Sequence, residues 1–477
     1  MQPFTSQECQ ALPITPEAFD EAAGNTPSPV DYYDAISKHY LVKNAAGRWL
    51  AHDLSSYKRI LRSRGCRSKP PEGSSLSEVD MQILDVQDHR DVSYHGPLCG
   101  RNAGFHDGNG CRFLVTEDLK LPEPVKGDWK ILNQVLRGLV SKNESAETGD
   151  AQFHTFCGWV KSSVEALREG REQQQQALAI CGPAGCGKSL IQHLITEMLA
   201  GRSAKAERYF NGKTNFNADL FAAEHLILED NYVSTRITDR MKLGASLKEH
   251  CVGVTTASLH AKGRTAINIR PWWRVSITLN DDPEAMMILP PLDEHLADKI
   301  ILLRASKSPF PMPVASSTEK HIFRNQLTQD IPAFIHWLLH EYEIPEAFAD
   351  KDRYNVATFH HPELKESLEK LSPESNLLSL IDSCFAEDFG CVEIKLTAKK
   401  IEDRLRERDS RAAEKILSFN NAMGTYLGRL SKKRRERIRY WRTSTGGLWE
   451  IIPPQNLTES ESRVSRCHDH DETGVTP

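Results

Sequence analysis

The chain has 477 residues, a formal net charge of −5 and 39% hydrophobic residues, which is the composition of a water-soluble protein long enough for two to four domains. It has no run approaching the roughly 20 apolar residues of a membrane span, and its first residues lack the basic and apolar regions of a secretion signal. We therefore expect a cytoplasmic protein without membrane partners. The eleven cysteines include no CxxC pair, so we expect free thiols in a reducing compartment.

Composition and periodicity divide the chain into five segments. Residues 1–30 are rich in Pro, Thr and Ser and predict a flexible lead-in, and residues 31–137 predict a small α/β module of unknown role. Residues 150–345 alternate helical patterns with the strand runs ALAI, HLILE and RVSITL, the order of a parallel sheet with crossover helices. The predicted fold is therefore an α/β ATPase core, followed by a basic domain over residues 375–452 and a disordered tail over 455–477.

A glycine-rich loop follows the first of these strands. The sequence GPAGCGKS satisfies the pattern GxxxxGK[ST] and lies between the apolar run ALAIC and the helical pattern SLIQHLITEMLAG. The loop consists of Gly182, Pro183, Ala184, Gly185, Cys186, Gly187, Lys188 and Ser189. In such a loop the backbone N–H groups surround phosphates, the lysine reaches the β- and γ-phosphates, and the hydroxyl ligates magnesium. The sequence therefore predicts a site for ATP and Mg²⁺.

Two later strands end in polar residues that complete such a site. The segment EHLILEDN ends in Glu229 and Asp230, and we expect Asp230 to hold the magnesium and Glu229 to polarise the attacking water, although the two roles can be exchanged. The strand at 275–279 is followed by Asn280, whose carboxamide can orient that water. Acidic turns and asparagines after strands are common, so the prediction depends on their order behind the glycine-rich loop.

The order GxxxxGKS, LILED, SLKEHCVG, HAKGR and ITLND resembles the superfamily 3 helicases, which are AAA+ ATPases, and in particular the primase-helicase proteins of phages, integrated mobile elements and large DNA viruses. The likeness covers about residues 150–310. The resemblance implies a hexameric ring that moves along single-stranded DNA in the 3′-to-5′ direction and opens forked DNA during replication of a mobile element or prophage. A primase or host replication proteins are implied as further partners. Residues 1–150 contain no hhDxD pattern of paired acidic residues, so we do not expect this chain itself to act as a primase.

The resemblance also implies residues that contact DNA and nucleotide. In the family, a β-hairpin between the second and third motifs projects into the ring channel and grips the strand with a basic tip. Lys262, with His260 and Arg264 beside it, falls at the matching place. Lys248 matches a basic residue that faces the nucleotide.

The arginine finger of the family has no direct counterpart. This residue follows the asparagine closely and stabilises charge on the γ-phosphate in the neighbouring subunit. Here no arginine follows Asn280 before Arg304, although Lys299 lies between them. Lys299 can supply a point charge without bidentate geometry, so both residues remain candidates.

The C-terminal segment predicts a DNA-binding domain. The runs IKLTAKKIEDRLRERD, AAEKILSFNNAMGTYLGRL and ERIRYWRTSTGGLWEII predict two helices and a β-hairpin that turns at Thr445-Gly446-Gly447, which is the order of a winged-helix domain. Tyr440 and Trp441 adjoin a basic run that suits phosphate contacts, and a solvated basic helix face is the alternative. The run contains Lys432, Lys433, Arg434, Arg435, Arg437 and Arg439.

Two further histidine patterns predict no site. His95, Cys99, His106 and Cys111 do not have the spacing of a common zinc finger, so turn histidines and buried thiols are expected. The pair His468 and His470 resembles that of nicking endonucleases but has no tyrosine after it.

Three functions therefore stay open. The leading one is an ATP-dependent DNA helicase or translocase that acts as a ring. The second is an ATP-switched DNA-binding initiator that does not unwind processively, and the third is a nucleotide-sensing defence protein whose ring is a scaffold. Processive strand separation distinguishes the first function from the other two.

Overall fold

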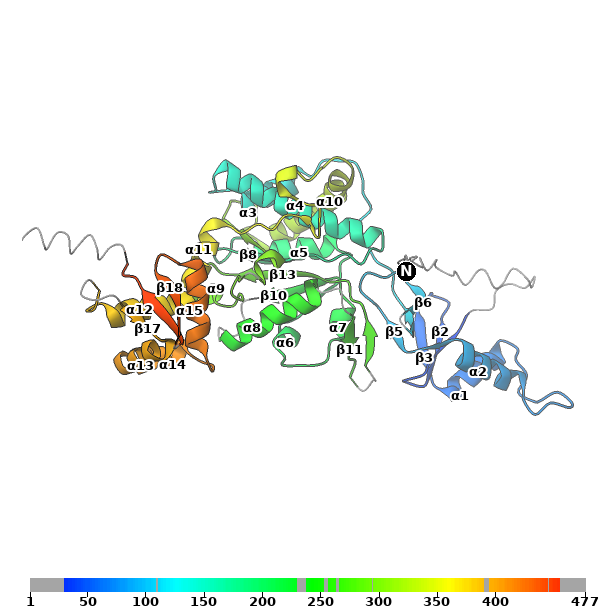
Figure 1. Ribbon diagram of the computed structural model, residues 1–477. Coiled ribbons are helices and arrows are strands. Elements are labelled where there is room, and N and C mark those ends of the chain that lie inside the picture. Colours follow the sequence, from blue (N-terminus) through cyan, green and yellow to red (C-terminus); the bar gives the residue numbers. More distant parts are fainter. Residues whose placement is uncertain are drawn as a thin grey trace, which may run out of the picture.

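The computed structural model describes residues 30–454 apart from residues 109, 230–236, 253–255, 263–265, 294, 390–393 and 445. An N-terminal module, a central sheet with its helices and a C-terminal domain follow one another along this part of the chain, and the first and last lie on opposite sides of the centre (Figure 1). No helix among these residues is long and apolar enough to cross a membrane.

The N-terminal module is built on two small sheets. The first has the order β3-β2-β1-β4 and the second has the order β5-β7-β6. Their strands are β1 (Tyr32–Asp34), β2 (His39–Lys43), β3 (Trp49–His52), β4 (Asp91–Val92), β5 (Tyr94–Gly96), β6 (Gly104–Gly108) and β7 (Cys111–Val115). Two helices, α1 (Leu54–Ser63) and α2 (Glu78–His89), begin at the N-caps Asp53 and Ser77, whose side chains accept backbone N–H bonds in the first turn. The stacked rings of Tyr40 and Tyr57 join the sheet to α1.

The central sheet confirms the predicted α/β fold with a parallel sheet. It has five strands in the order β14-β8-β13-β10-β9, and each neighbouring pair is parallel. The strands are β8 (Ala177–Cys181), β9 (Ser203–Lys205), β10 (His225–Glu229), β13 (Arg274–Leu279) and β14 (Ile300–Arg304). All residues of β8 and β13 are buried, because helices cover both faces of a parallel sheet. The carboxyl ends of the five strands therefore lie along one edge, where ligands bind in such sheets.

Helices of very different length surround the sheet (Figure 1). The longer ones are α3 (Lys130–Val140), α4 (Ala146–Arg168), α5 (Lys188–Met198), α8 (Ile237–Ser246) and α10 (Ser317–His340), and α8 continues into a π-helix (Leu247–Val252). The shorter elements are α6 (Glu207–Phe210), α7 (Ala218–Phe221), α9 (Pro283–Met286), α11 (Pro362–Lys370), the 3₁₀ turns Ala297–Lys299 and Glu346–Phe348, and the hairpins β11 (Ala257–Leu259)–β12 (Ile267–Ile269) and β15 (Ala349–Asp350)–β16 (Asn355–Val356). The largest hydrophobic core includes residues from 94 to 368. The predicted domain boundary at residue 137 falls inside α3.

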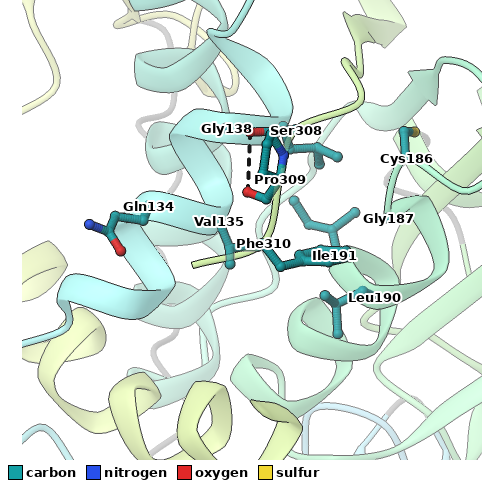
Figure 2. A pocket seen from close by; sticks show the side chains of 11 residues that line it. Gln134, Val135, Gly138, Cys186, Gly187, Leu190, Ile191, Ser308, Pro309 and Phe310 are labelled. Carbon is teal, nitrogen blue, oxygen red and sulfur yellow. Dashed lines mark hydrogen bonds between the residues drawn. The ribbon is translucent and has the colours of Figure 1, made fainter. Parts of the chain in front are cut away.

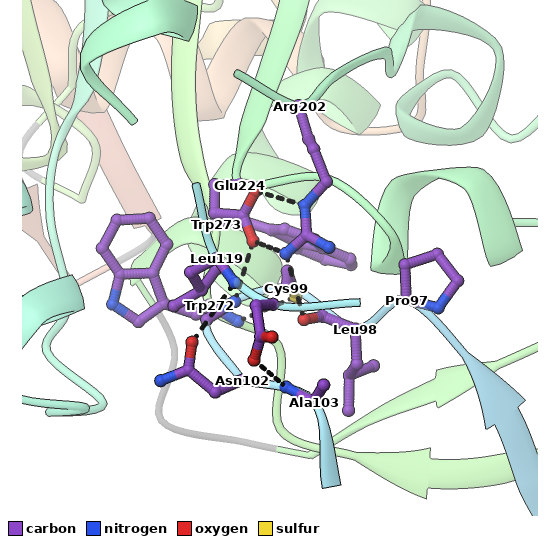
Figure 3. A network of polar contacts seen from close by, with 12 residues as sticks. Pro97, Leu98, Cys99, Asn102, Ala103, Leu119, Arg202, Glu224, Trp272 and Trp273 are labelled. Carbon is purple, nitrogen blue, oxygen red and sulfur yellow. Dashed lines mark hydrogen bonds and ion pairs between the residues drawn. The ribbon is translucent and has the colours of Figure 1, made fainter. Parts of the chain in front are cut away.

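A buried polar junction attaches the N-terminal module to the sheet (Figure 3). Glu224 precedes β10, and its carboxylate is fully buried. It forms an ion pair with Arg202, whose Nε and Nη2 both donate to it, and it also accepts the N–H of Gly100 at 3.0 Å. Cys99 N–H donates to Phe221 O, and Cys99 Sγ accepts the N–H of Trp272. A Cβ on Gly100, whose φ is +70°, would lie 2.6 Å from Trp272, so only glycine permits this close approach. The module is thereby fixed to the segment that connects β12 with β13.

The C-terminal domain has a core of its own, formed by residues from 377 to 451. Its elements are α12 (Pro373–Phe385), β17 (Ile394–Leu396), α13 (Ala398–Arg408), α14 (Ser410–Ile416), α15 (Ala422–Lys433), β18 (Ile438–Thr443) and β19 (Gly446–Ile451). The prediction of two helices before the hairpin was wrong, because the run predicted as the second helix is interrupted at residues 417–421 and forms both α14 and α15. Asn421, which precedes α15, has a φ of +64° and so does not continue a helix. The hairpin is present and its three-stranded antiparallel sheet has the order β17-β19-β18, but Gly446 already belongs to β19.

Candidate functional site

The glycine-rich loop lies at the carboxyl edge of the sheet, between β8 and α5. Gly187 adopts φ +111° as the N-cap of α5, a left-handed conformation that residues with a Cβ rarely adopt. Gly182 packs against the neighbouring strand so closely that a Cβ would lie 2.3 Å from Ala305 O. These two glycines explain locally why the loop turns tightly at the N-terminus of α5, where backbone N–H groups can bind an anion.

Lys188 meets Asn280 across 92 residues of sequence. The Lys188 ammonium donates to Gly182 O at 2.7 Å, to Pro183 O at 2.9 Å and to Asn280 Oδ1 at 3.0 Å. Asn280 follows β13, which pairs with β8 in parallel, so the register of these two strands brings the two side chains together. A phosphate that binds the ammonium competes with these neutral acceptors, and an ionised acceptor forms the stronger bond.

One open cavity of about 480 Å³ collects most of the predicted nucleotide-site residues. It is lined by Ala184, Gly185, Gly187, Lys188, Ser189, Leu190, Glu229, Thr278 and Asn280. These residues come from the ends of three adjacent strands, β8, β13 and β10, and from the start of α5. Ser189 is exposed and lines the cavity, so its hydroxyl is available to a metal ion. Asp230 lies outside the described residues.

Glu229 has two partners that the sequence did not reveal. Its Oε2 accepts a bond from Lys205 Nζ at 2.6 Å, and its backbone N–H donates to Glu207 Oε1 at 3.0 Å. Lys205 ends the neighbouring strand β9, and Glu207 begins α6 and is almost completely buried. The sequence does show a lysine at position 205, but its pairing with Glu229 can be inferred only when the order of the strands β9 and β10 is known. The Lys205 ammonium therefore forms an ion pair with a carboxylate that lines the cavity.

We expect Lys205→Ala to raise ATP hydrolysis in the absence of DNA. The Lys205 side chain is 60% exposed, and an exposed ion pair contributes about 0.2–1 kcal/mol, which corresponds to a rate increase of about 1.5- to 5-fold. Steady-state phosphate release checks this, with Lys242→Ala on the exposed surface of α8 as the control. A rate equal to or below that of the unaltered chain would show that the pair does not restrain Glu229.

Buried polar side chains connect α5 to the strands beneath it. Gln192 donates to Ser276 Oγ at 2.9 Å and accepts the Thr278 hydroxyl at 3.1 Å. His225 lies between Ser276 Oγ and Thr196 Oγ1, at 2.8 Å and 2.7 Å. Burial lowers the pKa of His225 to about 3, so the ring is neutral and bonds both hydroxyls. This network holds α5, and with it Lys188, in a fixed position relative to β13 and Asn280.

An apolar pocket lies on the other side of the glycine-rich loop (Figure 2). Helix α3 contributes Val135 and Leu139, α5 contributes Leu190 and Ile191, and the segment after β14 contributes Phe310. The pocket shares Gly187 and Leu190 with the larger cavity. An apolar surface therefore adjoins the phosphate-binding loop.

The three other basic residues predicted for the nucleotide site have different surroundings. Lys248 is exposed on the π-helix and is not among the described residues that line the cavity. The Lys299 side chain is buried and its ammonium lies 2.5 Å from Asp298. Arg304 ends β14 and pairs with Glu363 at 2.7 Å and with Glu144 at 3.8 Å. Each finger candidate therefore has an acidic partner within its own chain.

The β11–β12 hairpin extends away from the central sheet (Figure 1). Lys262 is exposed at its turn, His260 is half-buried, and Arg264 lies outside the described residues. Asn217 fixes the hairpin, because it accepts the N–H of His260 at 2.7 Å and donates to Ser258 O at 2.9 Å. The adjacent Phe216 is 53% exposed. Sequence reasoning missed this exposed aromatic side chain, which precedes the asparagine that binds the hairpin.

The C-terminal basic run is mostly accessible. Lys432, Lys433, Arg434, Arg435 and Arg439 are exposed, as are the rings of Tyr440 and Trp441 on β18. Arg437 differs, because it forms an ion pair with Asp382 and donates to Ile452 O. Arg437 therefore anchors the start of β18 to α12.

His95, Cys99 and His106, which were considered as zinc ligands, each have a different partner. His95 lies 2.8 Å from the buried Asp34, and His106 lies 3.0 Å from Asn102 O. Burial raises the pKa of the Cys99 thiol to about 12, so it is protonated at neutral pH. No group of three metal-ligating side chains occurs among the described residues. The side chain of Cys111 and the residues His468 and His470 lie outside them.

Comparisons with known proteins support the fold. No protein-family model and no curated protein matches the sequence. The apo structure of the NrS-1 C-terminal region is similar, with a TM-score of 0.51 and 12% identity over 89% of this chain and 96% of that chain. A structure described as the active helicase Cch of SCCmec type IV matches 85% of this chain and 73% of its own, with 10% identity and a TM-score of 0.30. The first likeness shows a shared fold, and the second is too distant to support an argument.

Proposed function

We propose that the protein is an ATP-driven DNA helicase or translocase of the superfamily 3, AAA+ type. The observation that carries this proposal is the cavity that Lys188 and Ser189 at the start of α5 share with Glu229 at the end of β10 and Asn280 after β13. A phosphate cradle, a carboxylate and a carboxamide at one edge are the groups that hydrolysis of a γ-phosphate requires. The three motifs lie in the order that resembles that family.

Each side chain has a distinct task in the proposed hydrolysis. The N–H groups of the loop and the Lys188 ammonium bind the β- and γ-phosphates and stabilise the charge that develops on them. Glu229 accepts a proton from the attacking water, and Asn280 Oδ1, held beside Lys188, orients it. Ser189 and Asp230 would hold Mg²⁺, which neutralises phosphate charge when bound. The apolar pocket beside Leu190 adjoins the cradle but, at about 20 Å³, has room for about one water molecule, so it is not assigned to the base of the nucleotide.

A basic group of the neighbouring subunit is proposed to complete the site. Arg304 and Lys299 remain the candidates, and either must exchange its acidic partner for the γ-phosphate. Arg304 is the more exposed of the two and has the planar donors that suit a phosphate. A hexameric ring places such a group at each site.

The proposed DNA-binding surface has two parts. Lys262, His260 and Phe216 at the hairpin combine charge with an exposed ring, the combination that binds single strands. The C-terminal domain, proposed to be a winged helix, presents Lys432, Lys433, Arg434, Arg435 and Arg439 to duplex or forked DNA. Replication of a phage or mobile element, with a primase or host proteins as partners, is the proposed setting.

The experiment is the rate of ATP hydrolysis with and without single-stranded DNA. We expect the strand to stimulate hydrolysis, and we expect Lys262→Ala to lose that stimulation while it keeps the rate measured without DNA, because Lys262 lies outside the nucleotide cavity. Lys320→Ala, an exposed change on α10, should behave like the unaltered chain. Full stimulation of the Lys262→Ala protein would remove the hairpin from the proposal.

The exposed basic residues of the C-terminal domain support a second function. An ATP-switched initiator would bind duplex DNA through this domain and would not unwind it processively. Such a protein would hydrolyse ATP at a rate independent of single-stranded DNA and of Lys262. The same experiment therefore separates the two functions.

A further inference from the structure

The N-terminal module carries a strongly basic segment that the proposed function does not use. Residues 54–71, which comprise α1 and the loop after it, contain six Lys or Arg residues and no Asp or Glu. The neighbouring α2 has the opposite composition, with Glu78, Asp80, Asp85 and Asp88 and no Lys or Arg. Charge is therefore segregated between two adjacent helices of one small module.

Three of the six basic residues are engaged with acids. Arg64 pairs with the buried Asp31 at 2.5 Å, and Lys58 and Arg67 lie 3.9 Å and 3.8 Å from acids of α2. Among the described residues, Arg59, Arg62 and Lys69 form no ion pair within 4 Å, although Arg59 interacts electrostatically with Asp53, the N-cap of α1. All three are exposed. We call these three residues the α1 basic surface.

The guanidinium groups of this surface are oriented by neutral hydroxyls. Arg59 Nη2 donates to Ser56 Oγ at 3.1 Å, and Arg62 Nε donates to Ser68 Oγ at 2.9 Å. The second bond draws residue 68, and hence Lys69, toward the helix. Arg59 and Arg62 are three residues apart and share one face, opposite the face that buries Tyr57 and Leu61. The hydroxyls restrict the side chains without cancelling their charge, so the remaining donors are available to an anion.

We propose that the α1 basic surface binds the phosphate backbone of duplex DNA, independently of sequence. Arginine donors and adjacent hydroxyls are the groups that contact phosphates in protein–DNA complexes. Binding of a single strand also requires exposed aromatic rings, and the one aromatic residue of segment 54–71, Tyr57, is fully buried. The composition of the surface therefore favours a duplex over a single strand.

The position of the surface suggests its use. The module lies on the opposite side of the central sheet from the C-terminal domain (Figure 1), and the junction at Glu224 fixes it to the segment that leads from the hairpin into β13. A duplex bound there is held at a second point, away from the C-terminal basic run. This inference does not depend on the proposed ATP hydrolysis.

The test is fluorescence anisotropy of the full chain with a labelled duplex of arbitrary sequence and with one of its strands, over a range of salt concentrations. The chain carries Lys432, Lys433, Arg434 and Arg435 changed to alanine, so that the C-terminal run does not mask the result. Into it we introduce Arg59→Ala, Arg62→Ala and Lys69→Ala. The matched control replaces three exposed basic residues elsewhere, Lys320, Arg324 and Lys365. Thermal melting and circular dichroism confirm that both variants fold.

We expect the α1 variant to lose duplex affinity on the order of tenfold at low salt, and the slope of log affinity against log salt to fall by about 2.7, since each lost phosphate contact removes about 0.9. Arg59→Lys with Arg62→Lys should retain most of the affinity, because a point charge still neutralises a phosphate. Duplex binding equal to that of the control would overturn the proposal. An equal loss for the single strand would also contradict it, by assigning the surface to single-stranded DNA.

Discussion

Replacing Lys188 with alanine is expected to lower ATP hydrolysis by about two to three orders of magnitude, the effect of removing one donor that stabilises transition-state charge. The ammonium lies in the cavity with Ser189 and Glu229 and is already oriented by Gly182 O and Pro183 O. Alanine has no donor, and water in this open cavity cannot replace a fixed charge. Steady-state phosphate release at saturating ATP measures the loss.

The control for this variant is Lys242→Ala, which removes an equal charge from the exposed surface of α8. Lys188→Arg is informative as well, because its charge persists but the planar guanidinium does not match the three acceptors around Nζ. We expect it to be nearly as inactive as the alanine variant. A Lys188→Ala protein that hydrolyses ATP as fast as the Lys242→Ala protein would show that the loop does not bind the reacting phosphates.

Glu229→Gln is expected to separate nucleotide binding from hydrolysis. The substitution preserves the size of the side chain but removes the carboxylate that accepts the proton, and loss of such a base costs about 10²- to 10⁴-fold in rate. The phosphate contacts of Lys188 and of the loop are unchanged, so ATP affinity should remain within a few fold. The bond from Lys205 to Glu229 Oε2 weakens, because its acceptor becomes neutral.

Two measurements check this separation: equilibrium binding of a fluorescent ATP analogue and phosphate release by the same preparation. Glu249→Gln, on the exposed surface of the π-helix, serves as the matched change. If the Glu229→Gln protein still hydrolyses ATP, Glu229 is not the base. Asp230 would then be the candidate, because the sequence allows the two residues to exchange roles. Lost ATP affinity would instead mean that Glu229 supports the cradle.

The central sheet could be predicted from the sequence because the patterns that indicate it lie within short runs of residues. The runs ALAIC and RVSITL are apolar throughout, as buried parallel strands require, and GPAGCGKS lies between a strand and a helix. The strand order is not local, and it is what brings Asn280 to Lys188 and Lys205 to Glu229. The motif residues could therefore be named in advance, whereas their partners could not.

The less accessible features depend on contacts between distant segments. The break between α14 and α15 is an exception, because it is local: it lies inside a run predicted as one helix, where Asn421 has a φ of +64°. Arg437 lies in a basic run that predicted phosphate contacts, but Asp382, 55 residues earlier, binds its guanidinium. The junction at Glu224 joins residues separated by 124 positions and includes no recognisable motif. Such pairs become visible only when the tertiary structure brings their elements together.

Helicase activity is tested by strand separation on a forked DNA duplex with one labelled strand, in the presence of ATP. We expect the unaltered chain to release the labelled strand, a nonhydrolysable ATP analogue not to support release, and the Lys188→Ala and Glu229→Gln proteins to release none above background. Hydrolysis of ATP without any release of the strand, or equal release with the nonhydrolysable analogue, would contradict an ATP-driven helicase.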